Sequence, residues 1–179
     1  MVNIVPEILT LNQYQKLNKE QLKLLRPVAC PHCGMKGSWI HGCYGRKADR
    51  QNTSKNTLNP ILVRRFFCPH CGKTCSVLPE CISPRRWYLW RMQQIALLLV
   101  LSGKSLSAIA KEITPSRHTV SRWLERFKER LRLHKDVLCQ HFSDLGRAHS
   151  FADFWTACIG KISLSKAMYF CHVAGVTIP

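Results

Sequence analysis

The sequence predicts an α+β protein assembled from small modules, in which a β-rich module precedes an all-α three-helix module and a short helical tail. Two observations carry this prediction. The string Cys-Pro-His-Cys-Gly occurs at 30–34 and again at 68–72, with alternating and β-branched residues between the copies. After residue 83 the apolar residues recur at helical spacing instead. We place the module boundaries at 1–29, 30–82, 83–135 and 136–179.

The first segment, 1–29, is expected to contain one amphipathic helix at Asn12–Leu25. Asn12 can cap this helix, and the residues Tyr14, Leu17, Leu24 and Leu25 fall on one face. We expect that face to pack on the module that follows.

The repeated strings are typical of one tetrahedral zinc site. Each Cys-x-x-Cys turn directs two sulfurs at the same metal, and two such turns complete the coordination. The glycine after each pair, Gly34 or Gly72, can take the positive φ that lets the chain turn away. The predicted ligands are Cys30, Cys33, Cys68 and Cys71. Four thiolates leave no position for water, so we expect one structural Zn²⁺ and no catalytic metal.

Other interpretations of the cysteines are weaker. A disulfide framework suits secreted chains, but residues 1–26 lack the features of a secretory leader, so we expect a reduced, cytoplasmic setting. A thioredoxin-like motif needs one pair inside a βαβ pattern. A second zinc would need His41, Cys43 and Cys75 as ligands, with His32 or His70 as the fourth. Because His41 and Cys43 are two residues apart in a predicted strand, they should lie on the same side of it. Isolated cysteines are more often small buried hydrophobes.

Strands are expected around the two cysteine pairs. Ser38–Tyr44 alternates bulky residues, Ile61–Phe67 is rich in β-branched and aromatic residues, and Lys73–Leu78 follows the second pair. Asp49–Asn59 is polar and rich in turn-forming residues, which favours the loop of a hairpin. This arrangement is typical of a zinc ribbon.

Three helices are expected between residues 83 and 135. The first runs from Ser83 to Leu101, because a serine cap precedes Pro84 at the first helical position. Ser105 caps a short second helix with one apolar stripe, and Ser116 caps a third. Two helices joined by a short break, the second of them basic, are typical of a helix-turn-helix.

The positive net charge of the chain indicates which class of partner it binds. The net charge is +17, of which residues 30–84 carry +6 and residues 85–135 carry +9. Such a field attracts a polyanion, and nucleic acid is the usual one, although a basic surface kept for solubility is the simpler alternative. The longest apolar run, Ile95–Leu101, is far short of the ~20 residues that cross a bilayer, so no membrane role is expected.

The 100° turn per residue assigns the faces of the third helix. Its core side should comprise Val120, Trp123, Leu124, Phe127 and Leu131, opposite His118, Ser121, Arg122 and Glu125. Residues in the first turn of a recognition helix usually meet base edges, and arginine can bond guanine bidentately. The residues expected to contact DNA are therefore Arg117, His118, Ser121 and Arg122. The alternative is a plain three-helix bundle with solvated arginines.

The chain resembles the DNA-binding N-terminal halves of bacterial insertion-sequence transposases, and the short transposase-associated proteins that carry only such a half. The likeness spans about residues 30–132 and rests on CPHCG, HGCYGRK, VRRFFCPHCGKTCSVLPE and SLSAIAKEITPSRHTVSRW. It implies zinc on the four cysteines and a ribbon and helix-turn-helix that bind element ends or an operator. In that group a basic-aromatic strand enters the second knuckle, so Arg64 and Arg65 are also expected to contact the duplex.

The likeness ends after the third helix. A full transposase continues into an α/β domain whose carboxylates hold two metal ions. Here 44 residues follow Lys135, and their acids are Asp136, Asp144 and Asp153. We expect two short apolar helices instead, at Phe151–Ile159 and Leu164–Ala174, with Gly175 as a C-cap.

Together these features predict a bacterial, cytoplasmic, nucleoid-associated protein that is not an enzyme: a transposase-like accessory or regulator of a mobile element, involved in transposition and DNA recombination. Its expected partner is duplex DNA. Further candidates are a transposase and a second copy of the chain, joined through the C-terminal helices. The alternatives are a stand-alone transcription regulator, an RNA-binding ribbon, and a nuclease or recombinase built from His141, Asp144, His149 and Asp153.

Overall fold

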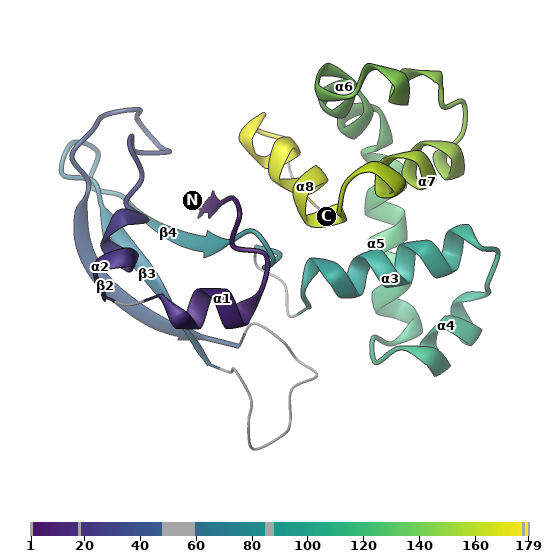
Figure 1. Cartoon of the computed structure of the whole chain (residues 1–179), viewed down its shortest axis with the longest axis horizontal. Coiled ribbons are helices and arrows are strands. Elements are labelled where there is room, and N and C mark those ends of the chain that lie inside the picture. The colour runs from purple at the N-terminus through teal and green to yellow at the C-terminus, as the bar shows by residue number, and fades with distance from the viewer. Residues whose placement is uncertain (1, 18, 48–59, 85–87, 177, 179) are drawn as a thin grey trace. The chain divides into compact units, whose positions relative to one another are not determined.

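The computed structural model describes residues 2–17, 19–47, 60–84, 88–176 and 178 and divides the chain into two compact units, Met1–Leu89 and Trp90–Pro179 (Figure 1). The first unit contains a four-stranded sheet and the second is helical, so the predicted α+β class is confirmed. The predicted loop Asp49–Asn59 lies outside the described residues. Within the described ranges, no helix combines the length and apolarity needed to span a membrane.

The sheet of the first unit has the strand order β1-β4-β3-β2. Its strands are β1 (Val2–Val5), β2 (Trp39–Arg46), β3 (Ile61–Phe67) and β4 (Thr74–Pro79). β1 runs parallel to β4, and the remaining pairs are antiparallel. The three strands predicted around the cysteine pairs are confirmed. β1 was not predicted, because its four residues pair with a segment more than seventy residues away and show no alternation of their own.

A β-bulge interrupts β2 and corrects one prediction. Ile40 pairs with Phe66, but the next aligned pair is Cys43 with Arg64, so β2 carries one extra residue, accommodated by Gly42 at φ +96°. The His41 ring lies 5.9 Å from that of Phe67, on the face opposite to Arg64. His41 and Cys43 therefore point to opposite faces, whereas regular alternation placed them together.

Two short helices replace the single helix predicted at Asn12–Leu25. They are α1 (Leu11–Lys16) and α2 (Lys19–Leu24). The N-cap of α1 is Thr10, not Asn12: the Thr10 side chain accepts the Gln13 N–H at 3.1 Å, and Gln13 Oε1 accepts the Thr10 N–H at 2.9 Å. Leu17 is extended and ends α1.

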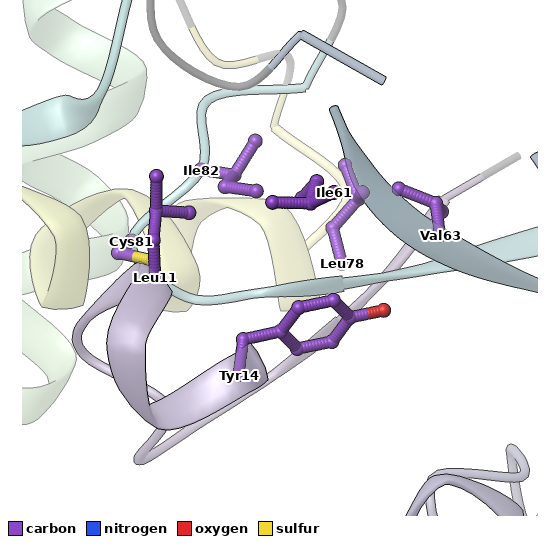
Figure 2. Packing of buried hydrophobic residues seen from close by; sticks show 7 residues of the cluster. All are labelled: Leu11, Tyr14, Ile61, Val63, Leu78, Cys81 and Ile82. Carbon is purple, nitrogen blue, oxygen red and sulfur yellow. The ribbon is translucent and has the colours of Figure 1, made fainter. Parts of the chain in front are cut away.

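One face of the sheet packs against α1, as predicted for the N-terminal segment. Leu24, which was predicted on the packing face, is instead exposed at the end of α2, because the break after α1 changes the direction of its side chain. Figure 2 shows Leu11 and Tyr14 of α1 facing the buried side chains of the sheet and of the segment after β4. The buried cluster consists of Leu11, Tyr14, Ile61, Val63, Leu78, Cys81 and Ile82. The Tyr14 hydroxyl donates to the Leu62 carbonyl at 2.8 Å, which anchors the helix to β3. A smaller cluster of Phe66, Cys75 and Val77 lies on the other face.

The second unit is helical throughout its regular structure (Figure 1). Its elements are α3 (Trp90–Leu101), α4 (Leu106–Glu112), α5 (Arg117–Glu129), α6 (Leu131–His141), η1 (Ser143–Arg147), α7 (Phe151–Lys161) and α8 (Leu164–Val173). The predicted second and third helices and both tail helices are confirmed. α6 and η1 were not predicted, because no proline or glycine marks the break between α5 and α6. Leu131, predicted on the core side of the third helix, is instead the first residue of α6.

α3 begins at Trp90, not at Ser83. Ile82 forms an antiparallel bridge with Leu89, so the chain reverses direction in this stretch instead of running on as a helix. The Ser83 side chain is buried. Residues 85–87, which the predicted helix included, lie outside the described residues.

Two of the predicted N-caps, Ser105 of α4 and Ser116 of α5, are confirmed. The Ser105 hydroxyl accepts the Ala108 N–H, and Ser116 Oγ accepts the Thr119 N–H. α8 ends in a Schellman motif, in which Gly175 takes φ +77° and the Val176 N–H reaches the Cys171 carbonyl at 2.9 Å. The predicted C-cap role of Gly175 is confirmed.

The core of the second unit lies among α3, α5 and the tail helices. Val120, Trp123 and Phe127 of α5 are buried, and α3 and α5 line one small apolar gap together. α8 contacts both α3 and α6, and its residues Leu164, Ala167, Met168 and Cys171 are fully buried. The apolar side chains of the tail are therefore used within this unit.

Candidate metal centre

Two turns of the same geometry carry the four predicted ligands. In the first, the Cys30 N–H donates to the Met35 carbonyl and the Gly34 N–H to the Cys30 carbonyl, both at 2.8 Å. In the second, the Cys68 N–H donates to Lys73 at 2.9 Å and the Gly72 N–H to Cys68 at 3.0 Å. The identical strings therefore fold into equivalent knuckles.

The glycine that ends each knuckle has the predicted conformation. Gly34 takes φ +73° and Gly72 takes φ +66°, a region that residues with a Cβ adopt at a cost. The second knuckle links β3 to β4, and the first precedes β2. Because β2 and β3 are paired neighbours, the sheet brings the two knuckles to the same end.

The four sulfurs converge. Cys30 Sγ lies 3.8 Å from Cys71 Sγ, Cys33 Sγ lies 3.7 Å from Cys68 Sγ, and all four atoms lie within 4.8 Å of one another. A tetrahedron with Zn–S bonds of about 2.3 Å has edges of about 3.8 Å. The donor set and its spacing are thus compatible with a structural zinc ion.

The four cysteines differ in burial, and the pKa values of Cys30 and Cys33 shift in opposite directions. Cys30 and Cys68 are buried, Cys71 is half-buried and Cys33 is exposed. Burial raises the pKa of the Cys30 thiol, but N–H groups of His32 and Cys33 and the neighbouring thiols lower it to about 7. The Met35 N–H and burial oppose each other at Cys33, and the other three sulfurs raise its pKa to about 12. Among sulfurs this close together, a first thiolate raises the pKa of the remaining thiols, and a bound cation would favour deprotonation of all four.

The residues considered for a second metal do not assemble. Among the described residues, the four-cysteine cluster is the only group of three or more side chains positioned to share a metal ion. Cys75 is buried on the Phe66 face of the sheet, where burial raises its pKa. The bulge separates His41 from Cys43, as shown above.

The predicted faces of α5 match its burial. Val120, Trp123 and Phe127 are buried, and Leu124 is half-buried. Arg117, His118 and Arg122 are exposed, whereas Ser121 is half-buried. Ser121 Oγ donates to Glu125 Oε1 at 2.9 Å, an interaction that sequence reasoning missed although the i, i+4 spacing indicates it.

Arg64 and Arg65 lie on opposite faces of the sheet, because successive residues of a strand alternate. Arg64 pairs across the strands with Cys43 and Val77, and Arg65 pairs with Ser76. Both are half-buried, and Arg65 Nη2 donates to Thr74 Oγ1 at 3.1 Å.

Three of the four residues considered for catalysis have structural contacts, and the fourth, His149, is exposed. Asp144 forms an ion pair with Lys161 at 2.6 Å, and the hydrogen bond from Lys161 lowers the pKa of Asp144. The Asp153 carboxylate accepts the Ser150 N–H in the capping box of α7. The His141 ring stacks on Phe170 with centroids 4.1 Å apart.

Comparison with known proteins places the chain in one family. No curated protein and no solved structure matches it significantly. Residues 30–123 match a family described as a domain of unknown function, DUF6431. The match runs from the first cysteine of the metal centre to Trp123 of α5. The chain therefore belongs to the DUF6431 family.

Proposed function

We propose that the chain is a DNA-binding protein in which the four cysteines hold one structural Zn²⁺, the sheet unit is a zinc ribbon, and α4 and α5 form a helix-turn-helix that reads duplex DNA. The zinc proposal is supported by the sulfur spacing of 3.7–3.8 Å, which fits tetrahedral thiolate coordination. With all four positions taken by thiolates, the metal stabilises the fold and does not bind substrate.

The division of α5 into two faces carries the DNA-binding proposal. Its buried side packs on α3 and α4, while Arg117, His118 and Arg122 stand exposed near its N-terminus. α4 and α5 are joined by only four residues, of which Ser116 caps α5. A short helix, a tight turn and a longer helix with an exposed basic first turn are what major-groove recognition needs.

The proposed DNA contacts are of two kinds: those that recognise base edges and those that bind the phosphate backbone. Arg122 can bond a guanine edge bidentately, whereas cations elsewhere contribute mainly through phosphates. Ser121 must exchange its bond to Glu125 before it can contact a base or phosphate. Because Arg64 and Arg65 lie on opposite sheet faces, a duplex against one face meets only one of them.

The proposed role is binding without catalysis, as an accessory or regulator linked to a mobile element. Asp144 and Asp153, the carboxylates that would serve a nuclease, form an ion pair and a helix cap respectively. Phosphodiester cleavage normally needs paired metal ions held by carboxylates or an activated nucleophile.

Arg122→Ala tests the reading role of α5. The bound sequence is first selected from random duplexes, and affinities for that site and for a scrambled duplex are measured by anisotropy. We expect Arg122→Ala to weaken the selected site by roughly 1–3 kcal/mol and to relax preference at one position, with a small effect on the scrambled duplex.

Arg132→Ala is the matched control, because Arg132 is also exposed but belongs to α6. It should lower affinity for both duplexes equally and slightly, as loss of one general charge does. Equal losses on both duplexes for Arg122→Ala would mean that another element reads the sequence.

A further inference from the structure

The first unit exposes aromatic rings that its core does not use. Trp39 is 61% exposed, His41 is exposed and Phe67 is half-buried. The Trp39 and His41 rings lie 6.3 Å and 5.9 Å from that of Phe67, at tilts of 50° and 30°. The cross-strand pairing of Trp39 with Phe67 and the bulge at Gly42 put these rings on one face of the sheet.

α1 packs on this face of the sheet away from the rings. Leu11 and Tyr14 pack over Ile61, Val63 and Leu78, at the far end of β3 from the cysteines (Figure 2). α1 ends at Lys16. At the metal end of the same face the rings remain accessible. Accessible rings grouped on one face offer flat surfaces on which a ligand ring can stack.

The surroundings of the rings are cationic. Arg65 shares the face with Phe67, and its guanidinium is positioned by Thr74. Lys36 and Lys73 are exposed in or beside the two knuckles. The sequence has no aspartate or glutamate in 30–48 or in 60–79, the segments that form the knuckles and β2 to β4.

We propose that the surface formed by Trp39, His41, Phe67 and Arg65, the aromatic face, binds unpaired bases of single-stranded nucleic acid. Flat rings offer stacking platforms to bases, and adjacent cations hold the phosphates. A duplex does not fit this chemistry, because its paired bases already stack on one another. The aromatic face belongs to the sheet unit and α5 to the helical unit, so this inference does not depend on duplex reading by α5.

Fluorescence anisotropy of the full-length, zinc-loaded chain with labelled oligo(dT) and oligo(rU) tests the proposal. Trp39→Ala should lower affinity for the preferred strand about tenfold, and Trp39→Phe, which keeps a ring, should retain most of it. Neither change should alter affinity for a random duplex. The two oligonucleotides separate DNA from RNA as the source of the unpaired bases.

Leu62→Ala is the matched control. Leu62 is also 61% exposed on β3 but lies on the opposite face, one residue from Val63. It should leave single-strand affinity unchanged. Equal losses for Trp39→Ala and Leu62→Ala, or affinities that follow total charge alone, would overturn the proposal. The proposal would also be overturned if Trp39→Ala retained single-strand affinity but abolished a dimer detected by light scattering. The aromatic face would then be the contact between two copies of the chain.

Discussion

At the scale of single residues, the convergence of the four cysteines depends on backbone conformation as much as on sulfur. The turn after each cysteine pair is closed by an N–H of Gly34 or Gly72 that donates to the first cysteine of the pair. Both glycines take a positive φ, and a Cβ would have open space around it at either position. The requirement for glycine is therefore conformational and not one of packing.

Gly72→Ala should consequently destabilise the zinc-loaded protein by about 1–2 kcal/mol, the cost of holding a residue with a Cβ in the left-handed region. The change is measured as the free energy of unfolding in urea. Gly160→Ala is the control, because Gly160 is exposed in α7 at a φ that needs no glycine, and it should stabilise by roughly 0.5–1 kcal/mol. A loss from Gly160→Ala as large as that from Gly72→Ala would refute the conformational argument.

At the scale of elements, one buried histidine is embedded between helices. His134 of α6 is fully buried, with Phe127 of α5 at 6.3 Å and Trp155 of α7 at 5.6 Å between ring centroids. Neither ring nitrogen has a hydrogen-bond partner among the described residues. Burial, with a smaller contribution from Arg130, lowers the pKa of His134 to about 4.

This burial predicts acid sensitivity of the helical unit. Between pH 6.5 and about 4, the His134 imidazole is protonated in the unfolded chain but stays neutral in the folded chain. The free energy of unfolding therefore falls as the pH falls through this window. The full effect is roughly 3 kcal/mol. Thermal unfolding followed at 222 nm should show this loss, and His134→Leu should remove it. A His134→Leu variant with the same pH dependence as the parent would assign the effect to other groups.

How far the sequence predicts these elements depends on whether the signal is local. The knuckles, the caps at Ser105 and Ser116, the faces of α5 and both tail helices were predicted, since each depends on residues close together in the chain. β1 was missed because its partner is β4. The bulge at Gly42 depends on how β2 pairs with β3, and the bridge between Ile82 and Leu89 depends on a reversal of the chain. The periodicity of apolar residues indicates neither feature.

At the scale of the whole molecule, the chain consists of two units with separate cores. The first buries two small clusters on its sheet, and the four cysteines lie at the end of that sheet. The second buries Trp90, Phe127, Phe154 and Trp155 among its helices, and none of these side chains belongs to the four-cysteine cluster. A small sheet with limited core is the kind of unit that a structural metal stabilises most.

Removal of the metal should therefore unfold the two units unequally. Purified protein is expected to hold one Zn²⁺ per chain, measured by elemental analysis, because four thiolates complete one shell. Structural zinc contributes roughly 10–16 kcal/mol of apparent binding free energy near neutral pH, more than the net stability of a small domain. Chelation, or Cys71→Ser, should thus unfold the sheet unit while the helical signal at 222 nm largely remains.

Cys139→Ser, which changes a cysteine of α6, should leave the zinc content at one. A folded sheet unit without metal, seen as dispersed amide resonances for β2 to β4 after chelation, would show that the sheet does not depend on zinc.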